Sequence, residues 1–166
     1  EEKKQTFQPI DIEIKEENYL ITGANMAGKT LILKTLCLNQ LLLQYGFKLP
    51  CQSGKVTLVE DIYTSIGDGQ NENEGISSFA YEILNLNNII KNIKNDKTYL
   101  LHVDELARTT NPIEGKKLVE GFLKVCNQRN SFVVVTTHYS DIEAPAKRMR
   151  VKGFKHQDVQ APLDIN

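Results

Sequence analysis

Residues 23–30 read Gly23-Ala24-Asn25-Met26-Ala27-Gly28-Lys29-Thr30 and directly follow the apolar run Tyr19-Leu20-Ile21. The stretch matches the pattern G-x-x-x-x-G-K-[ST] at every fixed position. Its two glycines allow a tight turn that brings successive backbone N–H groups close to phosphate oxygens. The apolar residues before it predict a strand, and the apolar run 31–43 after it predicts a helix. This context favours a nucleotide-binding P-loop over a chance glycine turn.

The residue types within this stretch predict how it would hold ATP and Mg²⁺. A helix opening near Gly28 offers unpaired N–H groups and the positive end of its dipole to a phosphate. Lys29 is expected to reach the β- and γ-phosphates, and the Thr30 hydroxyl is expected to ligate Mg²⁺. The helix that follows is apolar on most of its circumference, so we expect it to be buried against a sheet.

Length and composition indicate one ordinary globular domain spanning residues 1–166. The net charge of -1 provides no global positive field for nucleic acid, so a role on DNA would need other domains or a local patch. The first residue is Glu1 rather than Met, and we expect the chain to be the C-terminal part of a longer protein.

The three cysteines and the absence of long apolar runs predict the cellular compartment. Cys37, Cys51 and Cys126 are an odd number without C-x-x-C spacing, which favours a reducing, cytoplasmic setting. Cys37 and Cys126 fall in predicted helices and are expected to be core residues. No run reaches the length of a membrane span, and no signal peptide is recognisable, so no membrane partner is expected.

Strands and helices alternate along the rest of the chain. Apolar patterning predicts strands at residues 7–14, 18–22, 55–63, 98–103 and 131–137. Helices are predicted after the P-loop to about residue 45, from residue 77 to about 94, and from Pro112 to about Asn127, the last with Leu118, Phe122 and Val125 on one face. This order predicts an α/β fold with a largely parallel central sheet flanked by helices. Whether residues after Met149 complete the sheet stays open.

Polar residues follow two of the predicted strands. The strand 98–103 ends in Asp104-Glu105, which has the form of a Walker B segment. Asp104 would hold Mg²⁺, and Glu105 would orient or deprotonate the attacking water. The last predicted strand ends at His138, which could sense the γ-phosphate or the attacking water. A solvated acidic turn and a surface-loop histidine are the alternatives. Ligands of parallel sheets bind beyond the carboxyl ends of the strands, where Gly23, Asp104-Glu105 and His138 would converge.

Ser77-Ser78 opens a predicted helix, and either serine could be its N-cap. A helix N-terminus with two hydroxyls is also an anion site. The local sequence does not say whose phosphate it would bind. His102 in a strand and His156 near the end of the chain are expected to be structural or solvated.

Five segments together resemble the ATPase domain of the MutS family, which belongs to the ABC-type P-loop ATPases. They occur in the family's order and approximate spacing, and the resemblance runs from about residue 7 to about residue 142. Asn-Met inside the P-loop and Thr-His-Tyr after the last strand are more specific than a bare P-loop. The segments are residues 21–30, Ile62-Tyr63-Thr64-Ser65-Ile66-Gly67, Ser77-Ser78-Phe79-Ala80-Tyr81-Glu82, Asp104-Glu105-Leu106 and Thr136-Thr137-His138-Tyr139.

The resemblance implies a composite active site. Two such domains pair head to tail, as a homodimer or with a paralogue, and each site uses the P-loop of one and the Ser77-Ser78 helix of the other. Ser77, with Ser78 beside it, would then contact the γ-phosphate across the dimer. Phe7 is the candidate for stacking on adenine. In mismatch-repair members, ATP controls a clamp that holds mispaired DNA through separate N-terminal domains.

Several positions depart from the mismatch-repair pattern. Ala24 replaces the usual Pro, Ala27 a Gly and Ser65 an Arg, and residues 104–111 lack the two glycines of D-E-x-G-R-G-T-S. Divergent members of the superfamily include ATPases that reactivate cobalamin-dependent aminomutases. Remodelling of a protein client without DNA is therefore an alternative to mismatch repair, and a scaffold without hydrolysis is a third, against which Glu105 argues. An ABC transporter is disfavoured because no L-S-G-G-Q is present.

Overall fold

The computed structural model describes residues 9–15, 17–24, 27–66, 78–108, 110–129, 131–139 and 141–151. Strands and helices alternate along these residues up to the strand at Ser131–Thr136, as the sequence predicts, and one more strand follows it directly. None of the helices in these ranges is long and apolar enough to cross a membrane. The elements are β1 (Tyr19–Thr22), α1 (Lys29–Gln44), β2 (Asp61–Ser65), α2 (Ser78–Asn92), β3 (Tyr99–Val103), α3 (Pro112–Asn127), β4 (Ser131–Thr136) and β5 (Lys147–Arg150).

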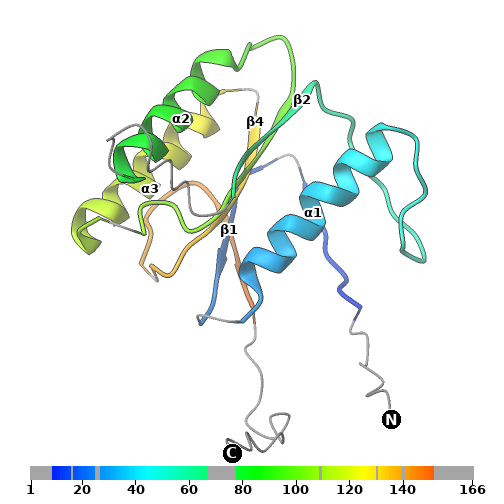
Figure 1. Cartoon of the computed structure of the whole chain (residues 1–166), viewed down its shortest axis with the longest axis horizontal. Helices are drawn as coiled ribbons and strands as arrows, with labels where there is room; N and C mark the ends of the chain where they lie inside the picture. The colour runs from blue at the N-terminus through cyan, green and yellow to red at the C-terminus, as the bar shows by residue number, and fades with distance from the viewer. Residues whose placement is uncertain are drawn as a thin grey trace, which may run out of the picture.

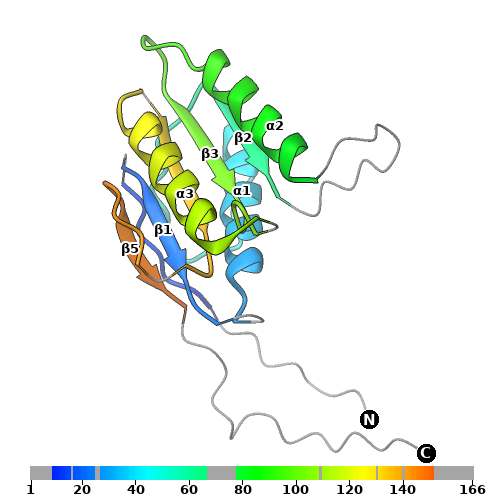
Figure 2. The same ribbon diagram turned by 90° about the vertical axis from the view of Figure 1, so that its left-hand side faces the viewer.

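The strands form one parallel sheet in the order β2-β3-β4-β1-β5. β4 lies between the strand that enters the P-loop and the strand that ends at Asp104, so those two strands are not neighbours. All carboxyl ends meet at the same edge of the sheet because every pairing is parallel. Helices α2 and α3 cover one face of the sheet and α1 covers the other (Figures 1 and 2). The α/β fold with a parallel sheet is therefore confirmed.

Alternation along the strands divides the core between the two faces. Leu101 and Val103 of β3 pack with α2 and α3, whereas Leu100 faces the side on which Leu33 of α1 is buried. Buried strands that face helices on both sides need apolar residues at successive positions, which is why β3 and β4 read as continuous apolar runs. The predicted core cysteines are also confirmed, since Cys37 and Cys126 are both buried.

Two predicted strands are wrong in extent. Residues 9–14 form no strand; Ile10 and Ile12 are exposed, and alternation alone supplied no pairing partner in the described chain. The strand expected over residues 55–63 begins only at Asp61, where it pairs with Tyr99 of β3. In contrast, no strand was predicted at Lys147–Arg150, and only the residues after Met149 were left open, yet β5 forms there and pairs with β1 as an edge strand.

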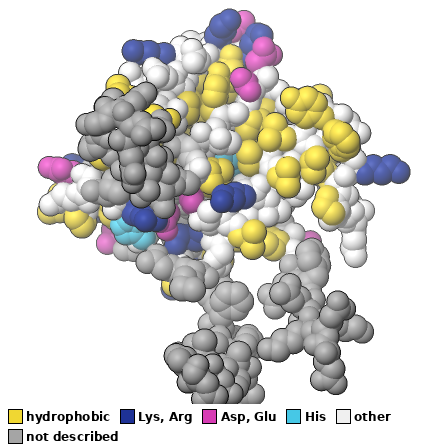
Figure 3. All heavy atoms as spheres, viewed as in Figure 1, with side chains coloured by type: hydrophobic (Ala, Val, Ile, Leu, Met, Phe, Trp, Pro, Cys, Tyr) yellow, Lys and Arg dark blue, Asp and Glu magenta, His cyan; other side chains and the backbone are white. Residues whose placement is uncertain are grey.

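The helix after the P-loop is buried against the sheet as expected, but along one stripe only, although its sequence is apolar on most of its circumference. Only Lys29, Leu33 and Cys37 of α1 are buried, and Leu31 and Leu38 are 67% and 56% exposed. Apolar side chains therefore gather on the surface over α1 (Figure 3). A helix that covers one face of a sheet buries one stripe and leaves its remaining surface outside the core cluster.

Helix α3 begins as predicted but turns a slightly different face to the core. Pro112 is its first residue, and the Asn111 side chain caps it by accepting from the Ile113 N–H at 2.9 Å. Val125, expected on the buried face, is 36% exposed. The buried stripe has the spacing four, three, one and three, and consists of Gly115, Val119, Phe122, Leu123 and Cys126.

Candidate functional site

The P-loop connects the carboxyl end of β1 to the first turn of α1. Gly28 is the N-cap of α1 and has φ 93°, a left-handed conformation that glycine adopts without a steric penalty. The Ala27 N–H donates to the Ala24 carbonyl at 3.2 Å, which closes the turn before the helix. Asn25 and Met26 lie outside the described residues. The predicted glycine turn and helix start are therefore where the sequence puts them.

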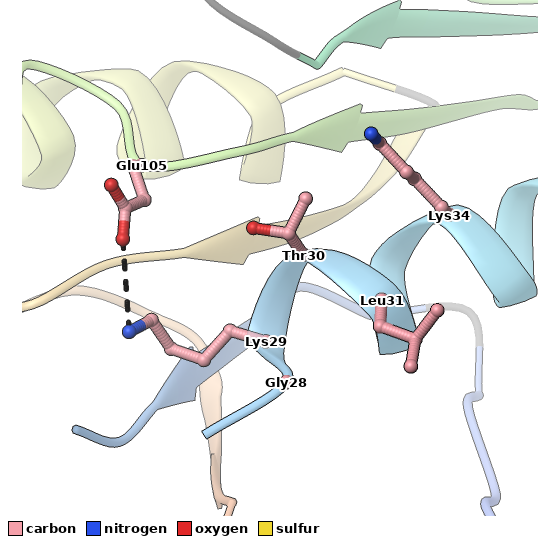
Figure 4. A pocket seen from close by; sticks show the side chains of 6 residues that line it. All are labelled: Gly28, Lys29, Thr30, Leu31, Lys34 and Glu105. Atoms are coloured by element: carbon pink, nitrogen blue, oxygen red, sulfur yellow. Dashed lines mark ion pairs between the residues drawn. The ribbon is translucent and has the colours of Figure 1, made fainter. Parts of the chain in front are cut away.

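Lys29 is held inside this loop. Its side chain is only 4% exposed, and its Nζ donates to the carbonyls of Gly23 at 3.0 Å and Ala24 at 3.2 Å. The same Nζ lies 3.7 Å from a carboxylate oxygen of Glu105, which faces it from the loop after β3 (Figure 4). A buried ammonium needs such partners, because an unpaired charge in the interior is strongly unfavourable. Lys29 and Glu105 are thus brought together although 76 positions separate them in the sequence.

Thr30 and Asp104 meet at the centre of the sheet edge. The Thr30 hydroxyl donates to Asp104 Oδ2 at 2.8 Å, and the hydroxyl of Thr136 donates to Asp104 Oδ1 at 2.5 Å. Thr136 Oγ1 also accepts from the Glu105 backbone N–H at 2.8 Å. Thr136 is fully buried and positions both acidic residues. This role was not predicted from the sequence, although a hydroxyl at the end of an otherwise apolar strand is a signal, since buried polar groups need partners.

The Thr30 and Asp104 side chains fit a Mg²⁺ ion. No three His, Cys, Asp or Glu side chains among the described residues cluster as a metal site. Mg²⁺ does not need such a cluster, since it binds through one or two protein ligands together with substrate phosphates and water. Thr30 supplies a hydroxyl oxygen and Asp104 a carboxylate, already in contact with each other. When bound there, the ion would neutralise charge on the β- and γ-phosphates.

Glu105 occupies a strained position. Its φ is 47°, and Ala107 two residues later has φ 64°; these are the non-glycine residues with positive φ in the described chain. The Glu105 side chain is 21% exposed and accepts from the Arg108 guanidinium at 3.2 Å. Strain of this kind persists only where surrounding contacts impose it, and it concentrates at functional sites.

His138 lies just beyond β4, at the same edge of the sheet, and is exposed. Its ring contacts the ring of Tyr139, with centroids 4.1 Å apart. The Thr137 N–H donates to the Ile21 carbonyl at 3.1 Å, so the segment that carries His138 is fixed to the strand entering the P-loop. Phe7 and Ser77 lie outside the described residues, and Ser78 is the first residue of α2, as expected.

A pocket of about 360 Å³ opens beside these residues, a size within the usual range for small-molecule sites. Figure 4 shows its lining, which combines the start of α1 with Glu105 from the loop after β3. The residues that line it are Gly28, Lys29, Thr30, Leu31, Lys34 and Glu105. Free N–H groups at the helix start, two lysines and a carboxylate can bind a phosphate chain and place a water beside it.

His102 is brought near the site but belongs to the core. It is 1% exposed, and neither ring nitrogen has a hydrogen-bond partner among the described residues. Burial lowers the pKa of its imidazole from 6.5 to about 4. The expectation that His102 is structural is consistent with this position in the middle of β3.

Comparison with known proteins identifies the family. A family model described as MutS domain V matches residues 19–164. The chain belongs to the MutS domain V family. Endonuclease MutS2 of Acetivibrio thermocellus is 36% identical to this MutS domain V over 146 residues, which cover 86% of this chain and 18% of that protein. Endonuclease MutS2 of Aquifex aeolicus is 37% identical over 142 residues, 84% of this chain and 18% of that protein. Endonuclease MutS2 of Caldanaerobacter subterraneus subsp. tengcongensis is 33% identical over 159 residues, 94% of this chain and 20% of that protein. This MutS domain V therefore spans less than a quarter of the length of these relatives.

Proposed function

We propose that this MutS domain V binds ATP with Mg²⁺ and hydrolyses it to ADP and phosphate. The observation that carries the proposal is the meeting of the P-loop with the acidic turn after β3. Thr30 bonds Asp104 at 2.8 Å, and Lys29 lies 3.7 Å from Glu105. These are two pairs of groups that phosphoryl transfer requires, one for the metal and one for the phosphate and the water.

The geometry suggests how ATP binding prepares Glu105. The Lys29 ammonium is shared among two carbonyls of the loop and the Glu105 carboxylate. Phosphate oxygens compete for the ammonium, so Glu105 is released toward solvent and a water molecule. The water oxygen then attacks the γ-phosphorus, its proton passes to Glu105, and the bond to the β–γ bridging oxygen breaks in line with the attack.

Two substitutions test this proposal. Lys29→Ala should abolish ATP binding, whereas Glu105→Gln should keep binding and reduce the hydrolysis rate by at least about a hundredfold. Binding is measured with a fluorescent ATP analogue and hydrolysis by phosphate release. Lys97→Ala and Glu60→Gln are matched controls, because this exposed pair lies at the opposite, amino edge of the sheet. Wild-type turnover in Glu105→Gln would refute the role of Glu105.

We further propose that two copies, or this chain and a paralogue, pair head to tail, with Ser77 and Ser78 of one facing the γ-phosphate bound by the other. Support comes from membership in the family and from α2, whose first residue is Ser78. Glu105→Gln should then accumulate an ATP-dependent dimer, and Ser77→Ala should prevent it. Light scattering with and without ATP measures the fraction of dimer in each variant. If Ser77→Ala weakened ADP binding by the monomer as much as it weakened dimer formation, this would argue against a contact across the dimer.

For the macromolecular partner we propose DNA, contacted through other parts of the complete protein. The support is that the relatives are named endonucleases, an activity directed at nucleic acid. Steady-state ATP hydrolysis by the complete protein, with matched or mismatched duplex at a stated salt concentration, tests this. A mismatch-dependent change in turnover would indicate a repair clamp. Basal turnover without any response to DNA would instead favour remodelling of a protein client, such as a cobalamin-dependent aminomutase.

A further inference from the structure

The loop after β3 carries Glu105 in a conformation that its own residues disfavour. Glu105 and Ala107 both have positive φ, at 47° and 64°. L-residues avoid this region because Cβ approaches the backbone carbonyl. The family resemblance places glycine at the second of these positions, but this chain has Ala107 there. Contacts from elsewhere in the fold must therefore hold the loop in place.

Both backbone polar groups of Ala107 are held by side chains from other segments. Its N–H donates to the Glu82 carboxylate of α2, with both oxygens at 3.3 Å, and its carbonyl accepts from the Tyr139 hydroxyl at 3.0 Å. Ala107 and its neighbour Leu106 are fully buried, and Tyr139 is 9% exposed. Burial raises the pKa of the Glu82 carboxyl, an effect that the Ala107 N–H partly opposes. A carboxylate kept in this half-buried place indicates that its bond to the loop is a built feature.

Gly115 of α3 provides the space for this arrangement. A Cβ at this position would lie 2.2 Å from Tyr139 Oη and 3.2 Å from the Ala107 carbonyl oxygen. No side chain can be accommodated there unless the tyrosine hydroxyl leaves the Ala107 carbonyl. The glycine at position 115 of α3 thus leaves room for the Tyr139 hydroxyl to reach the Ala107 carbonyl.

We propose that Glu82 and Tyr139 are positioning residues that hold Ala107, and through it the backbone of Glu105, in the geometry needed for hydrolysis. This inference rests on the proposed ATPase function. The two side chains come from segments that the same function puts at the γ-phosphate: Glu82 lies one turn into α2 from Ser78, and Tyr139 directly follows His138. We call the contact of Glu82 and Tyr139 with Ala107 the loop clamp. It links both segments to the loop that carries the attacking-water carboxylate.

The test removes the two halves of the loop clamp separately in the complete protein. Tyr139→Phe deletes only the hydroxyl and keeps the ring, and Glu82→Leu deletes the acceptor at similar volume. Each should lower kcat for ATP by about tenfold and leave KM within about twofold, since misplacing a catalytic group affects the reaction more than ground-state binding. Glu82→Gln retains an acceptor oxygen and should recover most of the loss that Glu82→Leu causes.

Two further measurements separate positioning from general loss of structure. Tyr19→Phe is the matched control, because it removes another buried tyrosine hydroxyl, one that accepts from Lys15 N–H at 2.9 Å at the amino end of β1. It should leave kcat unchanged. In hydrogen exchange, the peptide covering residues 105–108 should lose protection in Tyr139→Phe and Glu82→Leu, while residues of β3 stay protected.

The outcomes distinguish the two proposals. A wild-type protein without ATP turnover would overturn the proposed function and the positioning role with it. Wild-type turnover with kcat unchanged in Tyr139→Phe and Glu82→Leu would overturn the positioning role alone. An equal fall of kcat in Tyr19→Phe, or no difference between Glu82→Gln and Glu82→Leu, would also overturn it. A fall in kcat confined to the clamp variants, with exposed amides at residues 105–108, is the expected result.

Discussion

Thr136→Val tests whether the buried hydroxyl at the end of β4 holds the site together. Valine keeps the shape of threonine and removes the hydroxyl, which donates to Asp104 Oδ1 at 2.5 Å and accepts from Glu105 N–H at 2.8 Å. The residue is fully buried, so water cannot easily replace either bond. The substitution therefore leaves a carboxylate oxygen short of a donor and a backbone N–H without its acceptor.

The expected loss of stability follows from these two bonds. A hydrogen bond to a charged group contributes about 1.5–3 kcal/mol, and a buried donor left unpaired costs about 1–3 kcal/mol. The two effects overlap because both groups can relax toward the pocket, so we expect a total of about 3 kcal/mol. For a domain of this size that lowers Tm by roughly 6–12 °C. Hydrolysis should fall as well, because the Glu105 backbone loses an anchor, while a nucleotide can still contact Lys29.

Urea denaturation and thermal unfolding without nucleotide measure this loss, and Thr137→Val is the matched control. Thr137 is equally buried and adjacent, but its hydroxyl only accepts from Tyr139 N–H at 3.2 Å. The control should lose about 1 kcal/mol, the usual size for a neutral bond. Thr136→Ser keeps the hydroxyl and should restore hydrolysis. The reasoning would be refuted if Thr136→Val were as stable as Thr137→Val. It would also be refuted if Thr136→Ser hydrolysed ATP as poorly as Thr136→Val.

Three further predictions concern single residues of the sheet and its loops. Burial lowers the pKa of His102 from 6.5 to about 4, so the imidazole takes up a proton on unfolding between these pH values. The free energy of unfolding is therefore independent of His102 titration above pH 6.5 and falls by about 3 kcal/mol as the pH is lowered toward 4. His102→Leu should flatten urea-denaturation stability across that range, and parallel curves for both proteins would contradict this. Gly28 has φ 93°, so Gly28→Ala should lower the free energy of unfolding by about 1–2 kcal/mol and the affinity for ATP at least tenfold. The control Gly121→Ala, on the exposed side of α3, should raise the free energy of unfolding by about 0.5–1 kcal/mol. In an Ala107→Gly background the loop adopts φ 64° more readily, so Tyr139→Phe should lower kcat by less than about threefold; an undiminished effect would show that strain is not what the clamp opposes.

The elements that the sequence predicted well are those whose pattern is local. The left-handed Gly28 before α1, the start of α1, the buried strand β3 and the Pro112 helix start each follow from a few neighbouring residues, and the structure has all four. The acidic turn after β3 and the P-loop were expected to converge, which a parallel sheet requires. Local alternation was a poorer guide at residues 9–14, because a strand exists only where a neighbour pairs with it.

The features that the sequence could not supply depend on distant contacts. The outer face of α1 has apolar residues but is exposed. The sequence of a helix does not show how many of its faces are covered by other elements. Glu82 and Tyr139 matched the family motifs without any indication that they meet at Ala107. Val125 was placed on the buried face because the stripe of α3 was counted from Leu118 rather than from the buried Gly115. In each case the missing information is which element lies opposite.

The order of the strands explains why a threonine sits between the two halves of the site. Because β4 separates β1 from β3, the P-loop and the acidic turn approach each other across the carboxyl end of β4. Consecutive residues there face opposite neighbours: Thr136 bonds Asp104 on the β3 side, and the Thr137 N–H bonds Ile21 on the β1 side. The next residue, His138, leaves the strand at the same edge. The carboxyl end of β4 therefore contacts both halves of the site through two successive residues, and the Thr136 hydroxyl, which both donates and accepts, serves a carboxylate and a backbone N–H at once.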